Sequence, residues 1–206
     1  MSEAGTKLVE YWRSLKGSRR APLRSEIDPR DFAELLDHFF ILEVRSADDI
    51  RFRIAGIGFC EIAGFELRGT TPEAIFEKGD ATNKLGKTLH QVINGCAGVE
   101  LHLSARDEYG NPCRCRMVLL PLETELGGID RIMGCLEITS GRPITPLKFQ
   151  VISSRVHAGA GESAMEFAES QAKFTIVEGG SDPAPHNNYG KRPVLKVVSD
   201  QDEEET

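Results

Sequence analysis

Hydrophobic residues near the N-terminus recur at every third or fourth position, which is the spacing of one face of a helix. This pattern predicts an amphipathic helix over residues 7–16. Its apolar stripe consists of Leu8, Tyr11, Trp12 and Leu15. Asp28 followed by Pro29 is typical of a capped helix start, so a second helix is expected to run to about residue 36.

Residues rich in aromatic and β-branched types predict strands further along the chain. Residues 39–45 and 50–55 are expected to form a hairpin, because a short polar turn separates them. The glycine-rich residues 56–69 indicate short helical turns joined by tight corners. Thr71 and Pro72 predict the start of another short helix.

The most regular helical pattern covers residues 81–94. Its stripe consists of Leu85, Leu89, Val92 and Ile93. Three strands are predicted after it, at residues 99–106, 113–120 and 131–139, with turn sequences between them. They are expected to form an antiparallel meander.

The composition of the chain changes after about Pro146, where small and polar residues dominate and aromatic residues become sparse. Such a composition cannot bury enough apolar surface to fold. We therefore expect one folded domain over residues 7–140, a disordered N-terminus over residues 1–6 and a largely disordered acidic tail over residues 141–206.

One short apolar island interrupts this tail. It consists of Pro193, Val194, Leu195, Val197 and Val198. Proline and β-branched residues favour extended backbone, which can add to an exposed sheet edge, so the island is a candidate docking segment. The same island could instead fold back as an extra strand on its own domain, or have no role.

Charge and composition exclude several classes of protein. The formal net charge of -7 disfavours attraction to nucleic acid. The apolar runs are too short to cross a membrane, and the polar start is unlike a signal peptide, so a cytoplasmic protein is expected. Five cysteines are an odd number, and in a reducing compartment they are expected to be thiols.

The predicted order of elements resembles a PAS domain, which has a five-stranded antiparallel sheet with N-terminal helices and with helices between strands 2 and 3. The segments "YWRSLKGSRRAPLRSEIDPRDFAELLDHFFILEV" and "IRFRIAGIGFCEIAGFELRGT" resemble the single-PAS-domain regulatory proteins of alphaproteobacteria. The most specific matches are Tyr11 and Trp12, Pro22 and Arg24, residues 27–29, and residues 53–56 with Gly64 and Gly69.

This resemblance implies an α+β PAS fold and a role in signal transduction, in the control of the cell cycle, motility or stress. It implies action through a homodimer, through docking to a protein partner, or through a small-molecule pocket. The resemblance does not identify a cofactor, because one fold hosts many functions.

Two residues are candidates for holding a cofactor. His90 lies on the predicted long helix, near the position where haem-binding PAS proteins often place their ligand, and Cys96 follows it. A partly exposed histidine with no ligand role is the competing interpretation. Cys60 could form a flavin adduct, but its surroundings depart from the Asn-Cys-Arg run of light-sensing PAS domains, which favours a structural thiol.

Cys113 and Cys115 alternate along one strand, so both thiols are expected on one face, with Cys135 able to approach from the neighbouring strand. This spacing lacks the pairing typical of a zinc site, so we expect core packing and no metal. Four arginines alternate along two strands and could hold an anion, or could form a solvated face. They are Arg51, Arg53, Arg114 and Arg116.

The sequence contains none of the common catalytic motifs, so no enzymatic activity and no catalytic residue are expected. The main hypothesis is a protein-interaction module, and the alternative is a small-molecule or haem/redox sensor. The stripe of Leu8, Tyr11, Trp12 and Leu15 is a candidate homodimer interface, although it could instead cover the open face of its own sheet.

Overall fold

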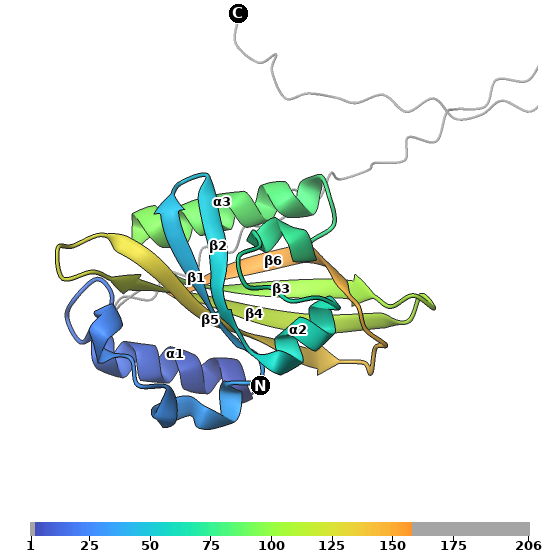
Figure 1. The fold of residues 1–206 in the computed structure, drawn as a ribbon, viewed down its shortest axis with the longest axis horizontal. Coiled ribbons are helices and arrows are strands. Elements are labelled where there is room, and N and C mark those ends of the chain that lie inside the picture. The colour runs from blue at the N-terminus through green and yellow to red at the C-terminus, as the bar shows by residue number, and fades with distance from the viewer. Residues whose placement is uncertain (1–2, 158–206) are drawn as a thin grey trace, which may run out of the picture. The chain divides into compact units, whose positions relative to one another are not determined.

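The computed structural model describes residues 3–157 of the 206-residue chain (Figure 1). Its α-helices are α1 (Glu3–Lys16), α2 (Ile57–Ala63) and α3 (Asp80–Gly95), and its 3₁₀ helices are η1 (Arg24–Glu26), η2 (Pro29–Leu35) and η3 (Pro72–Ile75). Its strands are β1 (Phe39–Ser46), β2 (Asp49–Ala55), β3 (Gly98–Arg106), β4 (Pro112–Glu123), β5 (Ile129–Ser140) and β6 (Lys148–His157).

The strands form one antiparallel sheet in the order β2-β1-β5-β4-β3-β6. Helices α2 and α3 lie on one face of this sheet and α1 lies on the other (Figure 1). The α+β arrangement with helices between the second and third strands is therefore as predicted. The sheet has one strand more than the predicted five, because β6 pairs with β3 along its whole length.

The domain extends beyond both ends of the predicted range of residues 7–140. Helix α1 begins at Glu3. Gly5, in its first turns, is buried and lets the helix lie close to the sheet. At the other end, Phe149 is fully buried and Val151 is nearly so, which anchors β6 to the core. The expected disorder of residues 3–6 and 141–157 is therefore wrong.

The predicted helix at residues 28–36 is a 3₁₀ helix, and its cap is confirmed. The side chain of Asp28 accepts a hydrogen bond from the backbone amide of Arg30 at 3.0 Å. Phe32 has non-helical backbone angles, which interrupt η2, and its ring packs against Tyr11 and Phe39. The aromatic contacts thus override the helical pattern at this position.

Aromatic rings fill the space between the sheet and helix α2. Phe40, Phe52 and Phe59 are 0–2% exposed, and their ring centroids lie 5.4–5.8 Å apart. Gly134 makes room for this cluster, because a Cβ atom there would lie 2.4 Å from the ring of Phe40. The core on this face is closed by the chain's own side chains.

Helix α1 packs its apolar stripe onto the opposite face of the sheet. Leu8 and Trp12 are 0% and 1% exposed, and they pack with Val118, Leu120 and other buried residues of β4 and β5. The indole Nε1 of Trp12 donates a hydrogen bond of 2.8 Å to the carbonyl oxygen of Pro121.

This packing corrects the proposed dimer interface. Leu8 and Trp12 already bury their apolar surface within their own subunit, while Tyr11 and Leu15 are partly exposed at the side of α1. An interface centred on the stripe would require the helix to leave the sheet and expose this surface to water. The alternative, that the stripe covers its own sheet, is the one the structure shows.

Replacing Trp12 by Phe should lower the free energy of unfolding by about 1 kcal/mol or more, since it removes the hydrogen bond to the carbonyl of Pro121 and removes buried atoms. Urea unfolding followed by circular dichroism measures this loss. Tyr109→Phe is the matched control, because Tyr109 is 71% exposed. Equal stability of the wild type and Trp12→Phe would show that the indole hydrogen bond does not hold α1.

Candidate functional site

Beside the apolar contact with α1, the same face of the sheet carries charged side chains on four strands. We call them the polar cluster: Glu100 and His102 on β3, Arg116 on β4, Glu137 on β5 and His157 on β6. The register places His102 opposite Arg116 and Arg116 opposite Glu137, so these three side chains form one row across the sheet.

Arg116 lies at the centre of the polar cluster. Its guanidinium is 3.5 Å from Glu100 Oε2 and 3.5 Å from Glu137 Oε2. The side chains of Arg116 and Glu100 are 11% and 9% exposed. A charge at this depth loses much of its hydration, and the opposite charge beside it compensates for that loss.

Two histidines also lie close to the carboxylate of Glu100. His102 Nε2 lies 3.2 Å from Glu100 Oε1, and His157 Nε2 lies 3.4 Å from Glu100 Oε2. The interaction with His157 and the charge of Arg116 lower the pKa of Glu100, although burial acts in the opposite direction. The carboxylate is therefore held ionised inside the protein.

A cavity of about 810 Å³ lies between the polar cluster and helix α1, and we call it the α1 cavity. The polar cluster lines it from the sheet. Its other lining residues are Thr6, Val9, Glu10 and Arg13 from α1, Ile138 and Thr139 from β5 and Arg155 from β6. Sequence reasoning missed this site, although the alternation of Glu100 and His102 with buried leucine and valine on β3 marks it.

The two proposed cofactor ligands, His90 and Cys96, contact different residues. His90 is exposed on α3 and lines a small surface cavity with Asp48 and Glu73. Cys96 is buried at the end of α3, where its Sγ accepts a hydrogen bond from Arg20. Because His90 points to solvent and no described contact joins it to Cys96, the structure does not bring the proposed haem site together.

The prediction that Cys113 and Cys115 lie on the same face of β4 is confirmed. Both thiols are buried in the core on the α3 side, with their Sγ atoms 3.8 Å apart, and burial raises the pKa of Cys115. Cys135 packs on the α1 side instead, where burial raises its pKa to about 12. The suggestion that Cys135 approaches the other two is therefore wrong, and within residues 3–157 no group of ligands suits a metal ion.

The remaining candidates are separate surface features. Cys60 is half-buried, with its Sγ 3.8 Å from Glu66 Oε1. Arg51 pairs with Asp49 at 2.6 Å on the edge strand β2, far across the sheet order from β4. Arg53 and Arg114 are exposed, so the four alternating arginines do not form one anion site.

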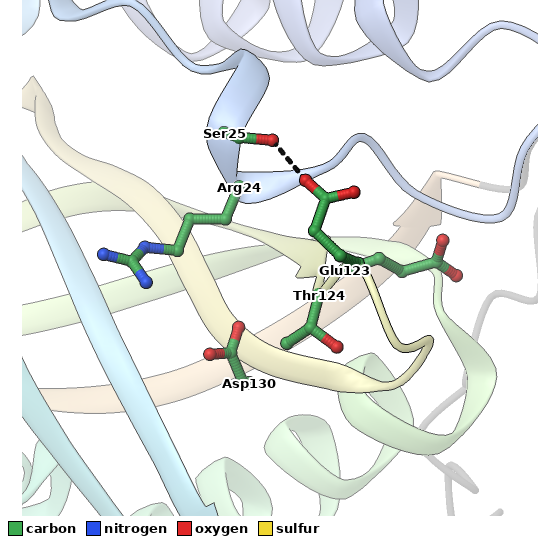
Figure 2. A pocket seen from close by; sticks show the side chains of 6 residues that line it. Arg24, Ser25, Glu123, Thr124 and Asp130 are labelled. Atoms are coloured by element: carbon green, nitrogen blue, oxygen red, sulfur yellow. Dashed lines mark hydrogen bonds between the residues drawn. The ribbon is translucent and has the colours of Figure 1, made fainter.

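A second cavity, of about 440 Å³, lies where the segment after α1 meets the β4–β5 hairpin (Figure 2). It is lined by Arg24, Ser25, Glu123, Thr124, Glu125 and Asp130. Ser25 Oγ donates a 2.7 Å hydrogen bond to Glu125 Oε1, and the backbone amide of Glu123 donates to Pro22. These bonds attach the segment to the hairpin, which is a structural role.

The lowered pKa of Glu100 predicts that stability falls with acid. The unfolded state binds this proton more readily, so the contribution of Glu100 is complete above its ordinary pKa of about 4.3 and is lost as the pH falls through its lower folded value. Glu100→Gln should therefore destabilise the protein at pH 7, and the gap from the wild type should close in acid.

Urea unfolding at a series of pH values measures this gap. Glu108→Gln is the control, since Glu108 is an exposed carboxylate with no hydrogen bond within residues 3–157. A gap between wild type and Glu100→Gln that stays constant from neutral pH into acid would contradict the assigned charge of Glu100.

Comparison with known proteins agrees with this architecture. The sequence profile of the PAS domain family matches residues 1–137. No curated protein matches the chain, and no helix within residues 3–157 has the length and hydrophobicity needed to cross a membrane.

Solved structures of low sequence identity were also compared. The light-state structure of the LOV domain of the blue-light photoreceptor Aureochrome1 has 15% identity and a TM-score of 0.41, covering 52% of this chain and 84% of that chain. The LOV protein of Rhodobacter sphaeroides has 11% identity and a TM-score of 0.42, and the match covers 55% of this chain and 69% of that chain. The PAS domain of the fruit-fly ELK potassium channel has 11% identity and a TM-score of 0.40, and the match covers 51% of this chain and 88% of that chain. On the match of its own sequence to the family profile, the chain belongs to the PAS domain family.

Proposed function

We propose that this PAS domain is a regulatory module that receives a signal and passes it on by binding another protein, without catalysing a reaction. The observation that supports this most directly is the closed core. Phe40, Phe52 and Phe59 occupy the space between the sheet and α2, so the chain's own side chains take the place that a large planar cofactor would need. A signal then has to act at the surface.

An exposed apolar corner offers a contact for a partner. Leu36, Ile54 and Ile57 are 38%, 51% and 75% exposed. The backbone of Leu36 and Asp37 packs directly against Gly56, which brings residue 36 close to the end of β2 and the start of α2, where Ile54 and Ile57 lie. Apolar groups gathered in this way favour a protein contact, because their burial in an interface is favourable.

The second candidate function is a small-molecule sensor. The α1 cavity favours it, because charged and hydrogen-bonding side chains from five elements line one hollow beside a helix. A haem or redox sensor built on His90 and Cys96 has no such support, since His90 is exposed and the contacts of Cys96 are with other residues.

The remaining parts of the proposal concern the cell. We expect a cytoplasmic protein that works in the control of the cell cycle, motility or stress, as a homodimer whose interface lies outside the buried part of the α1 stripe. The proposed docking segment is formed by Pro193, Val194, Leu195, Val197 and Val198, which lie outside the described residues.

The absorption spectrum of the purified protein tests whether the domain holds a haem or a flavin. We expect no haem or flavin band, and native mass spectrometry should give the mass of the polypeptide alone. His90→Ala should leave both measurements unchanged. A haem absorption band that disappears in His90→Ala would replace the protein-binding proposal with a haem sensor.

Substitution of the apolar corner tests the partner contact. Chemical cross-linking in cells that express the full chain should give defined protein adducts, and Ile54→Glu with Ile57→Glu should remove them, because two buried charges without partners oppose association. Leu126→Glu is the matched control, since Leu126 is 97% exposed on the distant β4–β5 hairpin. Adducts that persist in the double variant would show that the partner binds elsewhere.

A further inference from the structure

Among the residues that line the α1 cavity, two arginines and one glutamate form no ion pair with any residue of 3–157. Glu100 and Glu137 are both within 3.5 Å of Arg116, and Glu100 also lies within 3.4 Å of the two histidines. The carboxylates of the sheet are therefore already compensated. Glu10 on α1 is the one other carboxylate among the lining residues.

Two guanidinium groups line the cavity without such compensation. Arg13 comes from α1 and Arg155 from β6, and within residues 3–157 neither forms an ion pair or a side-chain hydrogen bond. Both side chains are exposed, so a ligand can reach them. They are carried by two different elements of the domain.

We propose that the α1 cavity binds a small organic acid with two carboxylate groups. A guanidinium presents a planar set of donors that matches a carboxylate, and two arginines on separate elements suit two carboxylates on one molecule. The nearby Glu10 opposes a ligand of higher negative charge, such as a polyphosphate. The cavity volume of about 810 Å³ accommodates a small molecule of this kind.

Binding has a consequence for helix α1. An acid that contacts Arg13 and Arg155 together connects the helix to the edge strand β6, and so favours the docked helix over any state in which it leaves the sheet. The fluorescence of Trp12 measures this change, because Trp12 is the single tryptophan of the chain and is buried between α1 and the sheet. The inference adds a ligand to the proposed signalling module and does not depend on its protein partner.

Isothermal titration calorimetry of the full chain with malonate, succinate and glutarate tests the proposal. At least one of these dicarboxylates should bind with a Kd on the order of 0.1 mM, a modest value for a small polar ligand. Acetate, which has a single carboxylate, should bind at least tenfold more weakly. The dicarboxylate that binds should also raise the urea concentration at which Trp12 fluorescence changes.

Arginine variants identify the site. Arg13→Gln and Arg155→Gln should each weaken binding roughly tenfold or more, which corresponds to one lost charge-assisted hydrogen bond. Arg53→Gln is the matched control, because Arg53 is also exposed but lies on β2, outside the cavity. Circular dichroism checks that each variant is folded.

Three results would overturn the proposal: no binding of any of the three dicarboxylates at about 10 mM, equal binding by wild type and both cavity variants, or equally tight binding of inorganic phosphate. None of these results would affect the cross-linking experiment on the apolar corner. The two proposals can therefore fail separately.

Discussion

The whole domain depends on covering both faces of its central strands. Every residue of β4 from Met117 to Leu122 is buried, so successive side chains carry apolar surface to both sides of the sheet. A sheet that is apolar on both faces needs a layer on each. Helices α2 and α3 supply one layer, and α1 supplies the other, with the hydrogen bond from Trp12 to Pro121 placing the helix on β4.

The second face changes from apolar to charged at Arg116. Val118 on β4 packs under α1, whereas Arg116, two residues earlier on the same face, belongs to the polar cluster. Gly5 lies over this boundary, since a Cβ atom there would be 3.0 Å from Arg116 Nη2 and 3.1 Å from Val118 Cγ2. The close approach of α1 and the geometry of Arg116 therefore constrain each other.

Much of the fold could be predicted from local patterns in the sequence. The long helix α3, the β1–β2 hairpin and the cap at Asp28 depend on residues near one another in the chain, and the structure has them close to the expected bounds. Strand β6 was missed because its apolar residues Phe149 and Val151 stand among polar ones, and their burial depends on pairing with β3, more than 40 residues earlier.

The functional site could be predicted only in part, because it depends on which strands become neighbours. The placement of Cys113 and Cys115 on one face could be predicted from the sequence of β4 alone. That Cys135 lies on the other face follows from its register opposite Val118, which no local pattern specifies. The uninterrupted apolar run of β4 did indicate that both faces of this strand are buried, and therefore that the apolar stripe of α1 covers one of them within the same subunit.

Strand β4 contributes to both layers with alternate residues. Cys115 and Met117 face the closed core, while Arg116 and Val118 face the α1 cavity and α1 itself. Close-packed cores resist small displacements, so the α3 side acts as a rigid support for this strand. The cavity on the other side is bordered by α1 and by the exposed side chains of Arg13 and Arg155, which form no ion pair within residues 3–157. A ligand that contacts Arg13 and Arg155 together would therefore act on the position of α1, because that helix carries one of the two arginines.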